Sequence, residues 1–164
     1  MDSEATDHPQ RARAAEIVYR QLAVRDRTRA ELERTLSGRE IPPEVTAEVL
    51  DAFERAGLVD DARFAAQYME RSRPARGLSR RGAALKLKRA GVDPAVVAQT
   101  LQNVDEADER AVALELARKK ARATRGLEPR VRERRIAAAL ARRGFTAGLV
   151  LDVTRAALQE ERSD

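Results

Sequence analysis

The feature that most constrains this chain is a helical pattern that recurs along it. The segment LKRAGVDPAVV, at 87–97, aligns with LARRGFTAGLV, which lies 53 residues further on at 140–150. Both segments have the order expected for the end of one helix, a glycine, an apolar residue and the start of the next helix. LSGREIPPEV, at 36–45, aligns with the first segment at an offset of 51 residues. Self-similarity with a period of about fifty residues is typical of tandem helical repeats.

Local signals inside the first repeat predict three helices. Apolar residues at helical spacing mark a first helix around 14–22. Thr28 and Glu31 have the spacing of a capping box at the start of a second helix, Pro43 suits the first turn of a third, and Gly57 suits its end. We therefore predict an all-α fold of three tandem three-helix repeats, at 11–57, 58–104 and 105–161, stacked into an elongated, curved body. Residues 1–10 are expected to be a disordered tail.

Composition argues against several classes of site. There is no cysteine, and the single histidine is His8, so thiolate or histidine metal sites and a Ser-His-Asp triad lack their required residues. The sequence also has no phosphate-binding glycine-rich loop and no apolar run long enough to span a membrane. We expect a cytoplasmic protein that is not an enzyme and binds no cofactor.

Two adjacent aspartates follow the first repeat, in the segment GLVDDARFA at 57–65. Adjacent carboxylates can ligate a metal ion, exchange protons in catalysis or cap a helix. A metal site would need further oxygen or nitrogen ligands, and residues 62–69 supply no other carboxylate. With Gly57 ending one helix, Asp60 falls at the N-cap of the next and Asp61 in its first turn, where both meet unpaired N–H groups. We therefore predict that this pair caps a helix.

Basic residues concentrate in the second and third repeats. Residues 1–57 carry nine basic and twelve acidic side chains, residues 58–104 nine and four, and residues 105–164 fourteen and eleven. No acidic residue lies between Arg71 and Arg89, so we favour a surface for phosphates or an acidic protein over a solvated helical face there. Where Lys and Arg alternate with Glu, a solvated face is the simpler interpretation. The candidate contact residues are Arg71, Arg73, Arg76, Arg80, Arg81, Lys88, Arg89, Arg118, Lys119, Lys120, Arg122, Arg130, Arg132, Arg134, Arg135, Arg142 and Arg143.

Base-specific reading of nucleic acid is not supported. Aromatic residues make up only 3% of the chain, and Asn103 is its one asparagine. Contacts with single- or double-stranded DNA are therefore expected to involve the backbone, to be weakly specific and to depend on salt.

Together, these features resemble the RecX family, whose members regulate the RecA recombinase. The resemblance is carried by GLVDD at 57–61, RFA at 63–65, Tyr68 and Arg71, by RTRAELERTL at 27–36, and by the glycine-centred segments at 88–97 and 140–150. It covers residues 11–160. Two stretches depart from the family pattern. Gly82, Ala83 and Ala84 stand where a larger apolar side chain is more usual, and SGREIPP at 37–43 replaces an Arg-Gly-aromatic turn.

The resemblance implies a non-enzymatic regulator that binds in the groove of the RecA filament, and we expect the protein to be a monomer. It would inhibit ATP hydrolysis, strand exchange and filament growth, and so modulate recombination, DNA repair and the SOS response. Two alternatives stay open. One is a stand-alone DNA-binding protein, a transcription or nucleoid factor, since each repeat superficially resembles a helix-turn-helix. The other is a protein-interaction scaffold without nucleic-acid contact.

Overall fold

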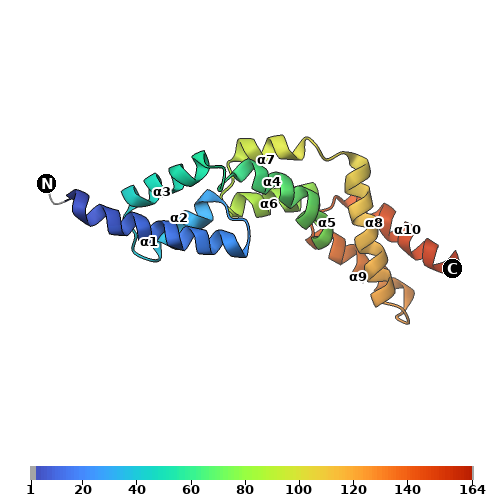
Figure 1. Ribbon diagram of the computed structural model, residues 1–164. Helices are drawn as coiled ribbons and strands as arrows, with labels where there is room; N and C mark the ends of the chain where they lie inside the picture. The colour runs from blue at the N-terminus through green and yellow to red at the C-terminus, as the bar shows by residue number, and fades with distance from the viewer. Residues whose placement is uncertain (1–2, 164) are drawn as a thin grey trace. The chain divides into compact units, whose positions relative to one another are not determined.

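The chain is helical throughout the part that the structure describes. The computed structural model describes the backbone of residues 3–163 and the side-chain surroundings from residue 8 onward, and no strand occurs in that range (Figure 1). The all-α prediction is confirmed. None of the described helices has the length and apolar composition needed to cross a membrane. The elements are α1 (Ser3–Val24), α2 (Arg29–Ser37), α3 (Pro43–Arg55), α4 (Asp61–Gln67), the π-helical turn η1 (Tyr68–Ser72), α5 (Arg73–Arg76), α6 (Arg80–Arg89), α7 (Pro94–Leu101), α8 (Glu106–Ala123), α9 (Pro129–Arg142) and α10 (Ala147–Ser163).

The described helices group into two compact units. Unit 1 runs up to Ala66 and includes Leu87–Val96, and unit 2 comprises Gln67–Lys86 together with the described residues from Val97 onward. Helices α4, α6 and α7 each contribute residues to both units. The boundaries of the three repeats, at 57/58 and 104/105, stay a prediction.

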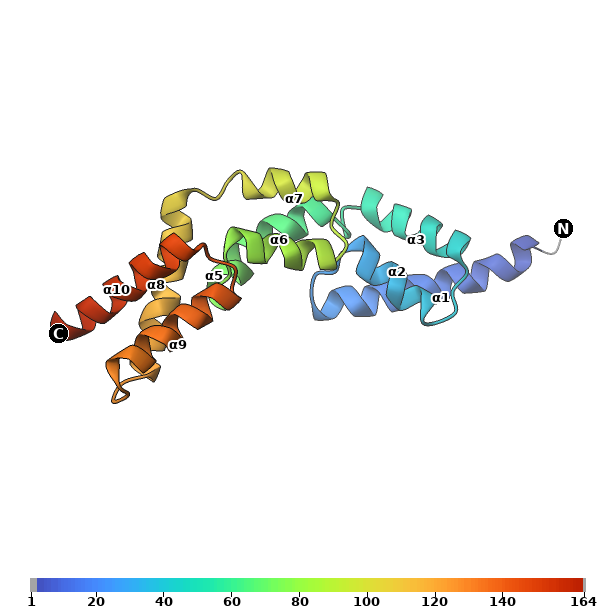
Figure 2. The same ribbon diagram turned by 180° about the vertical axis from the view of Figure 1, so that it is seen from behind.

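In unit 1, α1, α2 and α3 pack against one another (Figures 1 and 2). The predicted capping box is present at the start of α2. The Thr28 hydroxyl accepts the Glu31 N–H, and the Glu31 carboxylate accepts the Thr28 N–H, each at 3.1 Å. Pro43 is the first residue of α3, and Gly57 has a φ of 71°. These residues fix where the helices begin and end. The helices then share an apolar core, which consists of Ala14, Ile17, Val18, Leu32, Leu36, Ile41, Val45, Val49, Leu50, Phe53 and Val59.

The start of α1 differs from the prediction. The helix begins at Ser3, so residues 3–10, which we expected to be disordered, are helical, and residues 1–2 lie outside the described range. Pro9 lies inside α1. A proline removes one backbone donor, which weakens a helix locally, but the alanine-rich sequence that follows favours its continuation.

The two adjacent aspartates serve two different helices. Asp60 accepts the Arg63 N–H at 2.9 Å, which confirms it as the N-cap of α4. Asp61 instead accepts the N–H of Arg29, the first residue of α2, at 2.9 Å. Burial raises the pKa of Asp61, although the bond from Arg29 acts in the opposite direction. The pair therefore caps α4 and also fastens its start to α2.

Arg29 joins α2 to α3 through its side chain. Its guanidinium donates to Asp51 at 2.7 Å and to Glu54 at 2.6 Å, both on α3, and to Glu33 on α2 at 3.0 Å. Burial alone would lower the pKa of Arg29, but these three carboxylates raise it above its ordinary value. The Arg29 guanidinium is thus engaged by carboxylates of unit 1.

Replacing Glu31 with glutamine should lower the free energy of unfolding at neutral pH by less than about 1 kcal/mol. Burial tends to raise the pKa of Glu31, but hydrogen bonds from the Arg25 guanidinium and the Thr28 N–H hold the pKa below its ordinary value. At pH values near the ordinary pKa of a glutamate, the folded state therefore binds fewer protons than the unfolded chain. The stabilisation is present above the unfolded-state pKa and is lost as the pH falls through the folded-state pKa.

Urea denaturation of Glu31→Gln and the unchanged protein, from about pH 7 to pH 3, measures this effect. The difference in free energy of unfolding between Glu31→Gln and the unchanged protein should become smaller toward acid pH. Glu44→Gln, at an exposed position in the first turn of α3, controls for the loss of one negative charge. A difference that stays constant across the pH range would contradict the assignment.

Glu40 occupies the turn that departs from the family pattern, and its backbone has a φ of 60°, the one positive φ at a non-glycine position among the described residues. Side chains with a Cβ are disfavoured in this region, whereas glycine adopts it freely. Glu40→Gly should therefore raise the free energy of unfolding by about 0.5–1 kcal/mol. Thermal unfolding tests this, with Glu40→Ala as the control that keeps a Cβ and should change little. A less stable Glu40→Gly would show that the turn is not strained.

In unit 2, α8, α9 and α10 pack against one another pairwise (Figures 1 and 2). Their shared core contains Ala113, Leu114, Leu116, Ala117, Ala121, Ile136, Leu140, Phe145, Val150, Val153, Ala157 and Leu158.

The end of α9 lies directly against the start of α6. The Ser79 N–H donates to the Arg143 carbonyl oxygen at 3.1 Å. A Cβ on Gly82 would lie 2.6 Å from that same oxygen, and a Cβ on Gly144 would lie 2.6 Å from Ser79 Oγ. Because the two backbones approach this closely, neither glycine position has room for a larger side chain.

Candidate protein and nucleic-acid interface

One predicted contact residue is part of the interior of unit 2. Arg73 is 3% exposed, and its guanidinium forms an ion pair with Glu109 on α8. The Glu109 carboxylate also accepts the N–H of Arg80, the first residue of α6, at 3.0 Å. Glu109 thereby joins α5, α6 and α8. Because the charge of Arg73 is neutralised inside the fold, we assign this residue a structural part and not a partner contact.

Five further predicted residues have hydrogen-bond or ion-pair partners within unit 2. The Arg118 guanidinium donates to Glu160 on α10 at 2.7 and 2.9 Å, and this contact lowers the pKa of Glu160. Arg132 donates to Glu161 and to the Ala121 carbonyl. The remaining three are Arg80, which donates to the Leu101 carbonyl, Arg122, which pairs with Glu115, and Arg143, which donates to the Arg76 carbonyl.

The other predicted residues are available to a partner. None of them forms an ion pair with a described residue, and all are exposed except Lys120, which is half-buried. This free cationic set comprises Arg71, Arg76, Arg81, Lys88, Arg89, Lys119, Lys120, Arg130, Arg134, Arg135 and Arg142. Their prediction as contact residues stands untested by the geometry.

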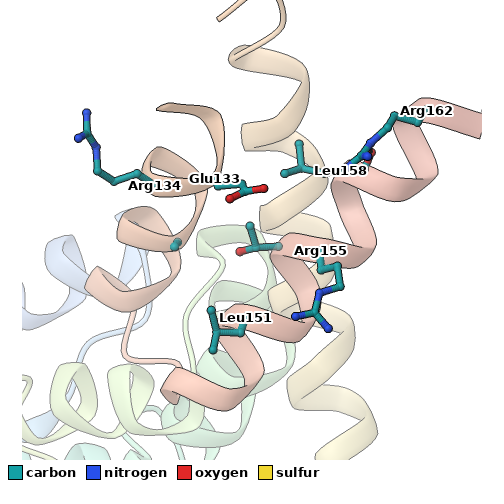
Figure 3. A pocket seen from close by; sticks show the side chains of 8 residues that line it. Glu133, Arg134, Leu151, Arg155, Leu158 and Arg162 are labelled. Carbon is teal, nitrogen blue, oxygen red and sulfur yellow. Dashed lines mark hydrogen bonds between the residues drawn. The ribbon is translucent and has the colours of Figure 1, made fainter. Parts of the chain in front are cut away.

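A groove runs between α9 and α10 in unit 2. Its volume is about 330 Å³, and its lining is Glu133, Arg134, Ala137, Leu151, Thr154, Arg155, Leu158 and Arg162. Figure 3 shows the Glu133 carboxylate pointing from α9 toward α10, with Arg134 and Arg155 extending away on opposite sides. The lining contains three arginines and one glutamate, and none of the four forms an ion pair with a described residue. We call this feature the α9–α10 groove.

Arg155 and Arg162 line the groove but are not among the contact residues predicted from the sequence. They stand seven residues apart on α10 and therefore share one face of the helix. Neither belongs to a dense run of basic residues, so neither stands out in the sequence. Their helical spacing together with Leu151 and Leu158 would have indicated a mixed apolar and cationic face.

A second cavity of unit 2 has a balanced charge. It measures about 700 Å³, and its lining includes Arg80, Arg81, Arg110, Glu106, Glu109 and Asp152. Arg110 pairs with Asp152 at 3.0 Å, and Glu109 is occupied by Arg73. Three cations thus face three carboxylates, so this cavity offers no net attraction for an anion. The described residues also contain no group of three or more His, Asp or Glu side chains placed to hold a metal ion.

Sequence comparison places the chain among proteins named regulatory protein RecX. That of Streptomyces coelicolor is 42% identical, over 96% of this chain and 83% of its own length. That of Thermobifida fusca is 43% identical, over 92% and 81%. The chain belongs to the RecX family. RecX of Mycolicibacterium smegmatis is also similar, with 38% identity over 98% of this chain and 89% of its own length.

The family's domain models match at both ends of the chain. The first three-helix domain of RecX matches residues 14–52, and the third matches residues 107–154. Both matches lie inside the predicted first and third repeats. The crystal structure of RecX from Lactobacillus salivarius has a TM-score of 0.74, covers 92% of this chain and 97% of its own, and is 18% identical. At that identity the match shows a shared RecX fold.

Proposed function

We propose that this RecX-family protein binds the RecA–DNA filament and inhibits its activities, namely ATP hydrolysis, strand exchange and filament growth. Two observations support the proposal. The chain belongs to a family of regulatory proteins and carries the motif order that resembles RecA regulators. It also presents a free cationic set, whose members form no ion pair with described residues and are thus available to phosphates or acidic protein surface.

The free cationic set gives the protein a means of binding the DNA phosphates of the filament. Each arginine or lysine that meets a phosphate releases a condensed counterion, so binding strengthens at low salt without base reading. A filament offers the same sites many times, and several weak contacts on one chain add through effective concentration. A protein that binds one filament state more tightly than another then shifts the population toward that state.

RecA-catalysed ATP hydrolysis on single-stranded DNA tests the proposal when this protein is added below stoichiometric ratio. The rate should fall as the ratio rises. Replacing Arg130, Arg134 and Arg135 together by glutamate should raise the concentration needed for half inhibition by about tenfold or more. Replacing Arg13, Arg39 and Arg55 by glutamate changes the charge equally at exposed positions of unit 1, and should have a smaller effect. No inhibition at any ratio would reject the function.

The exposed cations also favour the stand-alone DNA-binding alternative. A sequence-specific reader would bind its site at least about a thousandfold more tightly than random duplex. Equal affinity for unrelated duplexes would count against that alternative. If the triple variant on α9 lost DNA affinity yet still inhibited RecA fully, the protein-interaction scaffold would be the better description.

A further inference from the structure

We infer that the α9–α10 groove binds an acidic peptide segment of a partner protein, with an apolar side chain of that segment seated between the two helices. The inference goes beyond the proposed function, because it identifies a peptide site by its chemistry and does not require that the partner be RecA.

The apolar part of the groove includes an exposed leucine. Leu151 is 64% exposed, although it lies on α10 one helical turn from the buried Thr154. Ala137 and Leu158 continue the apolar lining on α9 and α10. An incoming apolar side chain would remove this surface from water, which favours binding.

The charged part of the groove suits carboxylates. Arg134, Arg155 and Arg162 line it without an ion pair among the described residues, whereas Arg118 and Arg132 nearby are already paired with Glu160 and Glu161. An unpaired guanidinium binds a carboxylate through two parallel hydrogen bonds. Because Arg134 and Arg155 extend on opposite sides (Figure 3), they would meet acidic residues on both flanks of the seated apolar side chain.

The Glu133 carboxylate inside the groove favours a peptide over nucleic acid. The Glu133 carboxylate points toward α10 and can only accept hydrogen bonds (Figure 3). Thr154 is 6% exposed, and its Oγ1 has no hydrogen-bond partner among the described residues. A peptide supplies backbone N–H donors for the Glu133 carboxylate, whereas the Thr154 hydroxyl can donate or accept and so suits either kind of partner. A phosphodiester backbone supplies no donor, and the negative charge of Glu133 would repel it.

Fluorescence anisotropy with the full-length protein tests the inference without RecA. The probe is a fluorescein-labelled fifteen-residue peptide of glutamate, alanine and leucine, with the leucines spaced as on one helical face. Two control peptides have every leucine changed to alanine or every glutamate changed to glutamine. The probe should bind at low salt, and each control peptide should bind about tenfold more weakly.

Matched variants locate the site. Arg155→Glu and Leu151→Asp should each weaken binding of the probe by about tenfold or more. Lys86→Glu makes the same charge change as Arg155→Glu at an exposed position on α6, outside the groove and outside the free cationic set, and should weaken binding less than about threefold because of screening. Thr154→Val keeps the side-chain shape but removes the hydroxyl group. It should therefore weaken probe binding, while thermal stability stays the same or rises.

Several results would overturn the inference. Equal losses of probe affinity for Lys86→Glu and Arg155→Glu would show a general electrostatic attraction and no defined site. Loss of single-stranded DNA binding for Arg155→Glu, with probe binding intact, would assign the groove to nucleic acid. A dimer in sedimentation that Leu151→Asp converts to a monomer would assign it to a second copy of the chain. Because RecA is absent, none of these results bears on the inhibition proposal.

Discussion

Arg73→Ala is expected to lower the free energy of unfolding by about 3–5 kcal/mol. The substitution removes the partner of Glu109 from the interior of unit 2, and Arg73 itself is 3% exposed. The carboxylate that remains would keep the hydrogen bond from the Arg80 N–H but lose its counter-charge. An unpaired charge in such surroundings costs much more than the loss of an exposed ion pair. Urea denaturation monitored by circular dichroism measures the change.

Two companion variants make this prediction specific. Arg71→Ala removes an exposed arginine of η1 that forms no ion pair with a described residue, and should change stability by less than about 0.5 kcal/mol. Arg73→Ala combined with Glu109→Ala should cost less than the sum of the two single changes, because the double variant leaves neither charge unpaired. Additive losses would show that the two side chains do not act as a pair.

Gly91→Ala is expected to lower the free energy of unfolding of the protein by about 2–4 kcal/mol. Two effects combine at this position. The backbone has a φ of 86°, where an L side chain is strained, and a Cβ would lie 2.3 Å from the Cβ of Ala30 on α2. The Thr28 hydroxyl also bonds to the carbonyl of the preceding residue, Ala90, so unit 1 has little freedom to move away from an added methyl group.

Gly57→Ala is the matched control for this substitution. Gly57 also has a positive φ, of 71°, but a Cβ there would meet no atom within 4 Å. It should therefore cost about 1 kcal/mol, from backbone strain alone. The difference between the two glycines measures the steric contact with Ala30. If both variants lost the same stability in urea denaturation, that contact would be relieved by small shifts.

Local interactions of unit 1 were predictable because their partners are close in sequence. The Thr28–Glu31 capping box, the Asp60 N-cap and the left-handed Gly57 each depend on residues within one helical turn, and the structure confirms all three. Asp61 shows the limit of that reasoning. It was assigned to its own helix, but its carboxylate accepts the N–H of Arg29, which lies in α2.

The candidate interface was less predictable because ion pairs join distant parts of the chain. Arg118 follows Glu115 by three residues, which suggested a solvated helical face, yet its closest carboxylate belongs to Glu160 on α10. Arg73 lies in a cluster without acidic neighbours in sequence and still pairs with Glu109. Which cations are free depends on tertiary packing, and so does the α9–α10 groove, whose lining comes from two helices. The stacking of the three repeats stays a prediction.

The contact between the end of α9 and the start of α6 limits how this chain can be divided. Ser79 and Arg73 find their partners in Arg143 and Glu109, both of which lie beyond the predicted boundary at 104/105. A fragment that stopped at that boundary would keep a complete middle repeat in its sequence but would lack the acceptor for one buried N–H and the counter-ion for one buried cation. The predicted second and third repeats are therefore not interchangeable modules, and a deletion meant to remove the third would damage the second.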